Sequence, residues 1–192
     1  MRSVADRIEL AAHIQGLWYP QWTSAWLKAV PAAPMITPEV RAALDAAGDD
    51  AALVVARRQV VQEFLDSHLY NWLPEDSAYG TFTGCEWRPL ARAELPRCVD
   101  EILAGAAARL AEVRAEEAAE RAEAEAGGYL DALGPPRFEG DMIDLEALRR
   151  WFTDELWDAT GPTWFTNMGP DFDEEPAVIG VDGDILALLW LP

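Results

Sequence analysis

The sequence has few of the residue types on which most catalytic and metal sites depend. It contains two cysteines and two histidines among 192 residues. No Cys-x-x-Cys pair or Cys/His cluster occurs, so we expect neither a disulfide framework nor a zinc site. Nucleotide-binding glycine motifs, zinc-protease motifs and nucleophile elbows are absent as well. The sequence therefore predicts no cofactor and favours a protein that is not an enzyme.

The cysteines and histidines have ordinary structural interpretations. We read Cys85 and Cys98 as free or buried thiols, and we expect His13 and His68 to fall on different helices. A Cys85/His68 nucleophile pair is the catalytic alternative, since a cysteine needs a positioned base. No motif surrounds either residue, so the structural interpretation is preferred.

Basic side chains are also scarce. The chain has 15 Lys plus Arg against 34 Asp plus Glu, which gives a net charge of −19. Such a charge disfavours direct contact with nucleic acid or with an anionic membrane, and it favours a protein partner with a basic surface. Long apolar runs are missing, and residues 1–7 carry charges where a signal peptide needs an apolar core. We therefore expect a cytoplasmic protein.

The sequence is rich in the residue spacings that are typical of α-helices. Its hydrophobic content of 51% is enough for a buried core. Apolar spacings of three and four residues, with capping residues and stops, predict most of the secondary structure. The expected helices cover residues 4–16, 20–31, 38–48, 50–72, 97–126 and 145–160.

The C-terminal region has a different pattern. An Asp182-Gly183 pair between two apolar runs predicts a β-hairpin with a two-residue primed turn. The second run, 185–191, is apolar at every position, so both faces of that strand must be covered. Residues 127–140, with two prolines, suggest a boundary. We predict a mainly α-helical, bundle-like domain over 1–128 and an acidic helix plus β-hairpin (α+β) unit over 129–192, packed on the first.

The helix at 97–126 should be the longest and should have two unlike halves. Its first half carries a coiled-coil-like seam over 99–113, whereas residues 114–126 have alanines and charges only. The second half should project into solvent or dock on another surface. A homo-oligomer formed through the 99–113 seam is an alternative, in which the protein is a helical scaffold or assembly subunit.

Charge is concentrated towards the C-terminus. Residues 129–192 hold 14 acids and three bases, against 20 acids and 12 bases in 1–128. Aromatic side chains, frequent at binding hot spots, accompany the acids. We therefore predict that the partner-binding residues are Asp154, Glu155, Trp157, Asp158, Trp164, Asp171, Asp173, Glu174 and Glu175.

Two metal sites are weighed against this interpretation. Asp154 and Asp158 have the one-turn spacing of an aspartate-rich magnesium motif, which would make the protein a small metal-dependent enzyme. Asp171, Asp173 and Glu175 alternate as calcium ligands do, but Pro176 stands where an EF-hand needs glycine. A solvated acidic face is preferred in both cases.

The function hypothesis follows from charge. We expect a non-catalytic acidic binding protein that masks a basic surface, as inhibitors and immunity-type proteins do. Carboxylates on rigid helices can imitate phosphates, so a nucleic-acid-binding defence enzyme or a nuclease toxin is a suitable target. An acidic surface that serves solubility alone is the competing explanation.

Overall fold

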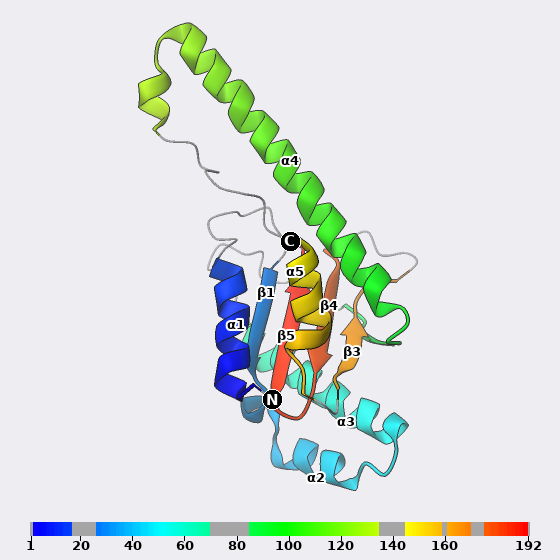
Figure 1. Cartoon of the computed structure of the whole chain (residues 1–192). Coiled ribbons are helices and arrows are strands. Elements are labelled where there is room, and N and C mark those ends of the chain that lie inside the picture. The colour runs from blue at the N-terminus through cyan, green and yellow to red at the C-terminus, as the bar shows by residue number, and fades with distance from the viewer. Residues whose placement is uncertain are drawn as a thin grey trace.

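A computed structural model describes residues 2–16, 26–69, 85–134, 145–158, 161–169 and 175–191. It has a compact body built on one β-sheet, from which a single long helix extends (Figure 1). The expected bundle-like arrangement is not observed, because a sheet and not a helix occupies the centre of the body. The fold is α+β.

The sheet has five strands in the order β1-β5-β4-β3-β2, and every neighbouring pair is antiparallel. Strands β1 and β2 precede residue 128 in the sequence, while β3 to β5 follow it, so both predicted parts of the chain contribute to the sheet. The strands are β1 Trp26–Pro31, β2 Arg88–Leu90, β3 Thr163–Thr166, β4 Ala177–Val181 and β5 Ile185–Trp190.

The helix expected over 20–31 is wrong in its described part, where β1 lies instead. This strand pairs with β5 from Trp26↔Trp190 to Pro31↔Ile185. Its side chains alternate between the two faces of the sheet, with Leu27 on one face and Val30 on the other. Pairing with a distant, fully apolar strand outweighs the local helical spacing, which sequence periodicity alone does not reveal.

Helices cover both faces of the sheet. One layer contains α1 Val4–Gly16, the first half of α4 Leu95–Gly127, and α5 Leu145–Arg150, which continues as the π-helix η5 Trp151–Glu155. The other contains the short η1 Ala33–Met35, α2 Pro38–Ala46, and α3 Asp50–Glu63, which continues as the π-helix η2 Phe64–His68. None of the helices among the described residues is long and apolar enough to cross a membrane.

Three helix starts are confirmed by their caps. Ser3 and Asp6 bond reciprocally through side chain and backbone N–H, at 3.0 and 3.1 Å. The pKa of Asp6 is lowered mainly by its hydrogen bonds with Ser3. Thr37 accepts from the Val40 N–H at 3.3 Å, and Asp49 accepts from the Ala52 N–H at 2.8 Å. These local bonds explain why helix starts were readable from sequence.

Strand β5 confirms the expectation that both its faces are covered. Leu186, Leu188 and Trp190 pack with α2 and α3, while the alternate residues pack with α1, α4 and α5. No side chain in the strand is more than 3% exposed. This strand joins the two hydrophobic clusters into one body.

The hairpin is confirmed, but its turn differs from the expected type. Val181 pairs with Leu186, so Gly183 and Asp184 form the loop, and neither has a positive φ. A primed turn is therefore wrong. The Asp182 carboxylate instead accepts from the N–H groups of Asp184 and Ile185, at 2.8 and 2.9 Å. Side-chain acceptance of this kind replaces the left-handed turn geometry.

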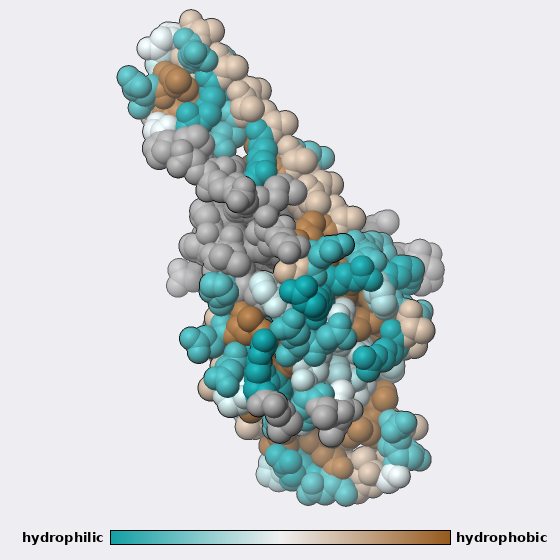
Figure 2. Space-filling view, in the orientation of Figure 1, coloured by the Kyte–Doolittle hydropathy of each residue, from teal (hydrophilic) through white to brown (hydrophobic). Residues whose placement is uncertain are grey.

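Helix α4 is the longest described helix, with 33 residues, and its halves differ as expected. Val99, Leu103 and Ala106 are buried in the core, so the predicted oligomerisation seam is used within the chain. Beyond residue 110 the helix leaves the body (Figures 1 and 2). It ends at Gly128, which has a φ of 76°, and the short η4 helix Leu130–Leu133 folds back against it. We call residues 111–134 the arm.

Candidate functional site

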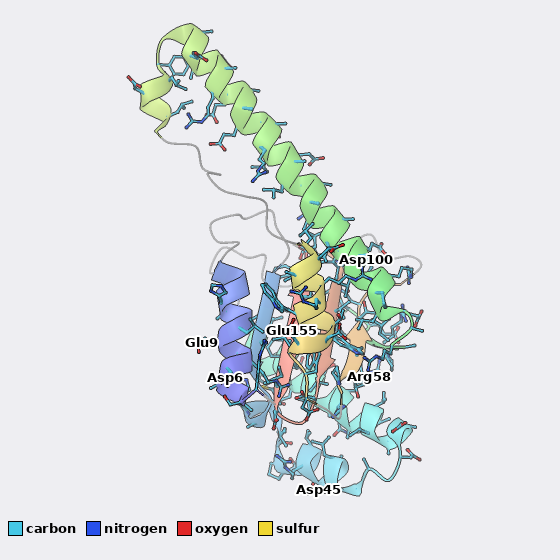
Figure 3. The ribbon with its side chains drawn as sticks, in the orientation of Figure 1. Asp6, Glu9, Asp45, Arg58, Asp100 and Glu155 are labelled. Atoms are coloured by element: carbon cyan, nitrogen blue, oxygen red, sulfur yellow. The ribbon has the colours of Figure 1, made fainter. Side chains whose placement is uncertain are left out.

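The predicted acidic contact residues are not all available to a partner. Asp154 is exposed. Glu155 is 3.0 Å from Arg2 and 3.0 Å from Arg150, so its charge is already paired (Figure 3). Asp158 accepts from a backbone N–H at 3.2 Å and so stabilises a turn. Only Asp154 of these three retains the character expected of a contact residue.

The two tryptophans predicted to contact a partner pack against each other. Trp157 and Trp164 have ring centroids 5.0 Å apart in an edge-to-face arrangement, and both lie against Gly180. Trp164 is 4% exposed, so it cannot reach a partner in this fold. The prediction that Trp164 contacts a partner is therefore wrong, because its side chain packs in the hydrophobic core.

The acidic segment before β4 is only partly described. Glu175 accepts a hydrogen bond from the Trp190 indole N–H at 3.0 Å, which fixes its side chain beside the sheet. Asp171, Asp173 and Glu174 lie outside the described residues. The calcium-ligand alternative and the partner contacts assigned to these three positions stay predictions.

The one-turn spacing of Asp154 and Asp158, on which the magnesium alternative depends, is not observed. Residues 151–155 form a π-helix, and the Leu156 N–H bonds to the Trp151 carbonyl at 3.0 Å. Asp158 lies beyond the end of this helix, so it is not one α-helical turn from Asp154. Among the described ranges, no group of three or more metal-ligating side chains gathers.

The cysteines have the expected character. Cys85 is half-buried and Cys98 is fully buried, and the two do not form a disulfide with each other. Burial raises the pKa of Cys98, which keeps the thiol protonated and unreactive. The His68 side chain lies outside the described part of the chain, so the Cys85/His68 pair stays untested.

A buried ion pair that sequence analysis missed joins α1 to the hairpin. The Arg7 guanidinium donates to the Asp182 carboxylate and to the Leu156 carbonyl through two of its nitrogens, and its third nitrogen is 3.5 Å from Asp184. Arg7 is 2% exposed and Asp182 is 3% exposed. One signal was available, because Arg7 falls within the apolar stripe that includes Ile8.

A second buried arginine lies beside this pair. Arg57 on α3 donates to the Gly161 carbonyl at 3.2 Å and to the Thr163 hydroxyl at 3.1 Å. Burial lowers the pKa of Arg57, while the negative charges of Asp182 and Asp158 oppose that shift. The donors and acceptors of this cluster are directed at one another, so we assign it a structural role.

Most of the charged residues in the arm are acidic. Residues 111–134 contain seven acids and two bases. Four exposed glutamates repeat at intervals of three or four and share one helical face. We call Glu112, Glu116, Glu120 and Glu123 the acid row.

Exposed alanines occupy the neighbouring face of the arm. In Figure 2 they form a pale apolar strip beside the hydrophilic side of the helix. The remaining face is covered by the returning chain, where Ala124 is fully buried and Arg121 donates to the Gly134 carbonyl at 2.6 Å. The arm thus exposes one row of glutamates and one row of alanines to solvent.

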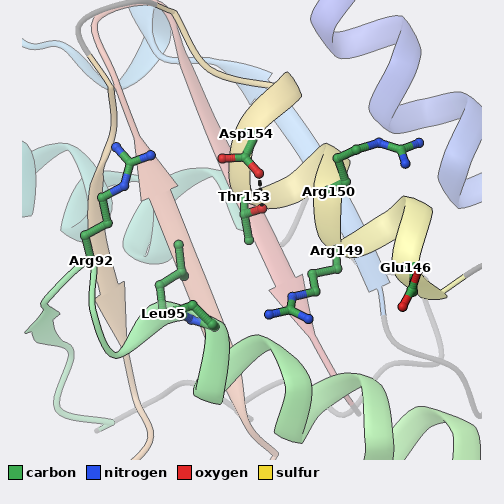
Figure 4. A pocket seen from close by; sticks show the side chains of 8 residues that line it. Arg92, Leu95, Glu146, Arg149, Arg150, Thr153 and Asp154 are labelled. Carbon is green, nitrogen blue, oxygen red and sulfur yellow. Dashed lines mark hydrogen bonds between the residues drawn. The ribbon is translucent and has the colours of Figure 1, made fainter.

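The body has a pocket of about 470 Å³ between the start of α4 and the α5–η5 helix (Figure 4). Arginine and acidic side chains both contribute to its walls. The lining residues are Arg92, Leu95, Pro96, Glu146, Arg149, Arg150, Thr153 and Asp154. Of the predicted site residues, Asp154 alone lines it.

Among the described residues, the acid row and this pocket are surface features that a binding partner or ligand could contact. No protein family model matches the chain, and no curated protein or solved structure shows significant similarity to it.

Proposed function

We propose that the protein is a non-catalytic binding protein whose acidic arm engages a basic surface on another protein. The observation that carries this proposal is the acid row, four exposed glutamates on a helix that extends beyond the body. The C-terminal residues predicted earlier are replaced as the main contact region by the arm. Asp154 remains as a contact residue on the body.

The acid row is electrostatically unbalanced within the chain. None of its four glutamates forms an ion pair with a described residue, whereas neighbouring Glu117 lies 3.7 Å from Arg121. Like charges four residues apart destabilise a helix by roughly 0.2–0.5 kcal/mol per pair. Glu112, Glu116 and Glu120 form two such pairs. Basic side chains of a partner would relieve this repulsion, and the relief would strengthen binding.

The geometry of the row supports a particular class of target. Residues three or four apart on a helix are separated by about 4.5 or 6 Å along its axis, so the carboxylates form a line of closely spaced negative charges. A nucleic-acid-binding surface recognises such lines of charge through its Lys and Arg side chains. The proposed target is therefore a nucleic-acid-binding enzyme, such as a defence enzyme or a nuclease toxin, which the arm would block.

The test compares two variants with equal net charge. The first neutralises the acid row as Glu112→Gln, Glu116→Gln, Glu120→Gln and Glu123→Gln. The control neutralises four exposed acids of the body, Glu9→Gln, Asp45→Asn, Asp66→Asn and Glu86→Gln. Glu9 and Asp45 lie on α1 and α2, away from the arm (Figure 3).

Each protein is immobilised and exposed to extract of its native cells at low and at high salt, and captured proteins are quantified by mass spectrometry. We expect the wild type and the control to retain a nucleic-acid-binding protein at low salt, and the acid-row variant to lose it. The purified partner should then show a slower association rate with the acid-row variant. Equal capture by both variants would disprove the role of the arm.

A further inference from the structure

The pocket between α4 and the α5–η5 helix contains charges of both signs. Two of its arginines are compensated within the chain. The Nε of Arg149 lies 3.3 Å from Asp100, and the Nε of Arg150 lies 3.0 Å from Glu155. Three other charged residues line the pocket without an ion pair to any residue in the described ranges, namely Arg92, Glu146 and Asp154. The pocket therefore has no excess positive charge, and it suits a ligand that itself carries both signs.

Arg92 and Asp154 face one another from opposite walls of this pocket (Figure 4). Arg92 lies in the turn between β2 and α4, where the Glu94 N–H bonds to the Ala91 carbonyl at 2.8 Å. Asp154 lies on η5, and its carboxylate accepts from the Thr153 hydroxyl at 2.8 Å. Both charges are thus carried by hydrogen-bonded elements, and the space between them can hold a molecule that contacts both.

The helical geometry of η5 places its acid in the pocket wall. The Leu156 N–H bonds to the Trp151 carbonyl at 3.0 Å, which closes a wider turn than that of an α-helix. Such π turns are rare and occur frequently at functional sites. Thr153 and Asp154 belong to this turn, and both line the pocket. The irregular part of the helix therefore coincides with the unpaired carboxylate.

The pocket also has an apolar part and the size of a small-molecule site. Its volume of about 470 Å³ falls within the roughly 300–1,000 Å³ range of such sites. Leu95 and Pro96, the first two residues of α4, line it. The first turn of this helix contains no acid, so its positive end can attract a negatively charged ligand group beside Arg92. A positive group, a negative group and an apolar surface thus occur together.

We propose that this pocket binds a free α-amino acid, with its carboxylate on Arg92 and its ammonium group on Asp154. An aliphatic side chain of the ligand packs against Leu95 and Pro96. Both polar contacts are charge-assisted hydrogen bonds, which are roughly twice as strong as neutral ones. A zwitterion has no net charge, so the charge of −19 on the chain does not repel it, whereas that charge and Glu146 both disfavour an anion. This site is independent of the arm.

The test is a nuclear magnetic resonance titration of the ¹⁵N-labelled protein with L-leucine at constant pH and ionic strength. We expect saturable shifts of the backbone amide signals in residues 92–98 and 149–154. Isocaproate lacks the ammonium group of leucine, and isopentylamine lacks its carboxylate. Each should bind at least about tenfold more weakly than leucine, because one charge-assisted contact is missing. The absence of saturable shifts with leucine, or equally tight binding of either analogue, would overturn the proposal.

The pocket variant, Arg92→Gln with Asp154→Asn, keeps the net charge and should weaken leucine binding about tenfold or more. The matched control, Arg41→Gln with Asp45→Asn, also keeps the net charge and changes two exposed residues of α2 that do not line the pocket. Its affinity should stay within about twofold of the wild type, because distant charges are screened. If the double pocket variant fails to fold, Arg92→Gln alone tests the site. Equal affinities of the pocket and control variants for leucine would also overturn the proposal.

Discussion

The body and the arm are both regular structure, but they are stabilised by different physics. Every residue of β5 is buried, whereas Ala124 is the single buried residue of the arm. The body is held by apolar side chains that meet across the sheet. The arm is held by the intrinsic helix preference of Ala, Glu and Arg and by one short returning segment. Stability in the body thus depends on distant contacts, and stability in the arm depends on local ones.

The largest effect expected from this comparison is the loss of the buried ion pair. Asp182→Asn keeps a side-chain oxygen at the turn but removes the charge that compensates buried Arg7. Breaking such a pair leaves an uncompensated buried charge, and we expect the free energy of unfolding to fall by about 3–5 kcal/mol. Urea denaturation at neutral pH measures it.

The control is Asp184→Asn, at the same turn. The Asp184 side chain is 48% exposed, so its contact with Arg7 is screened by water. Its removal should lower the unfolding free energy by less than about 1 kcal/mol. Similar losses of unfolding free energy in both variants would mean that the buried Arg7–Asp182 pair stabilises the protein no more than the exposed Arg7–Asp184 contact does.

Core truncation should have the next largest effect. Leu188→Ala removes a side chain that is 3% exposed and packs between the sheet and the α2–α3 layer. We expect a loss of about 2–5 kcal/mol in urea denaturation, as for other large-to-small core changes. Val55→Ala, at a side chain that is 61% exposed, should change the unfolding free energy by less than about 0.5 kcal/mol.

The smallest global effect is expected in the arm. Ala118→Gly should lower local helix stability by about 1 kcal/mol, and amides near it should exchange hydrogen roughly fivefold faster. The urea midpoint of the body should not move, because the arm can open without exposing the core. Ala106→Gly lies in the buried half of the same helix and should lower global stability. A shift of the body midpoint by Ala118→Gly would show that body and arm unfold together.

Local chemistry made part of the fold predictable. The helix starts at residues 38 and 50, the long helix with unlike halves, and the apolar strand covered on both faces at 185–191 all appear where the sequence predicts them. Each depends on residues close together in the chain, or on a pattern of two or 3.6 residues. The helix expected at 20–31 failed for the converse reason, since its described part is decided by a partner strand more than 150 residues away.

The candidate site was less predictable than the fold. The sequence marked Asp154 and the acidic character of the chain, but it assigned Trp164 to a surface that the core occupies. The acid row lies in the helix expected to project, although the C-terminal region had been preferred for partner contact. Arg92 and Arg149 gave no signal, because isolated arginines acquire meaning only when folding places them around one pocket.

The sequence by itself determined the helix starts, the projecting helix and its row of glutamates, because hydrogen bonds and side-chain spacing within a few residues govern them. The tertiary structure alone decided which strand borders β5, which acid compensates Arg7 and which arginines line one pocket. These contacts join distant parts of the chain. Their free energy comes from burial and pairing that exist only after the chain has folded.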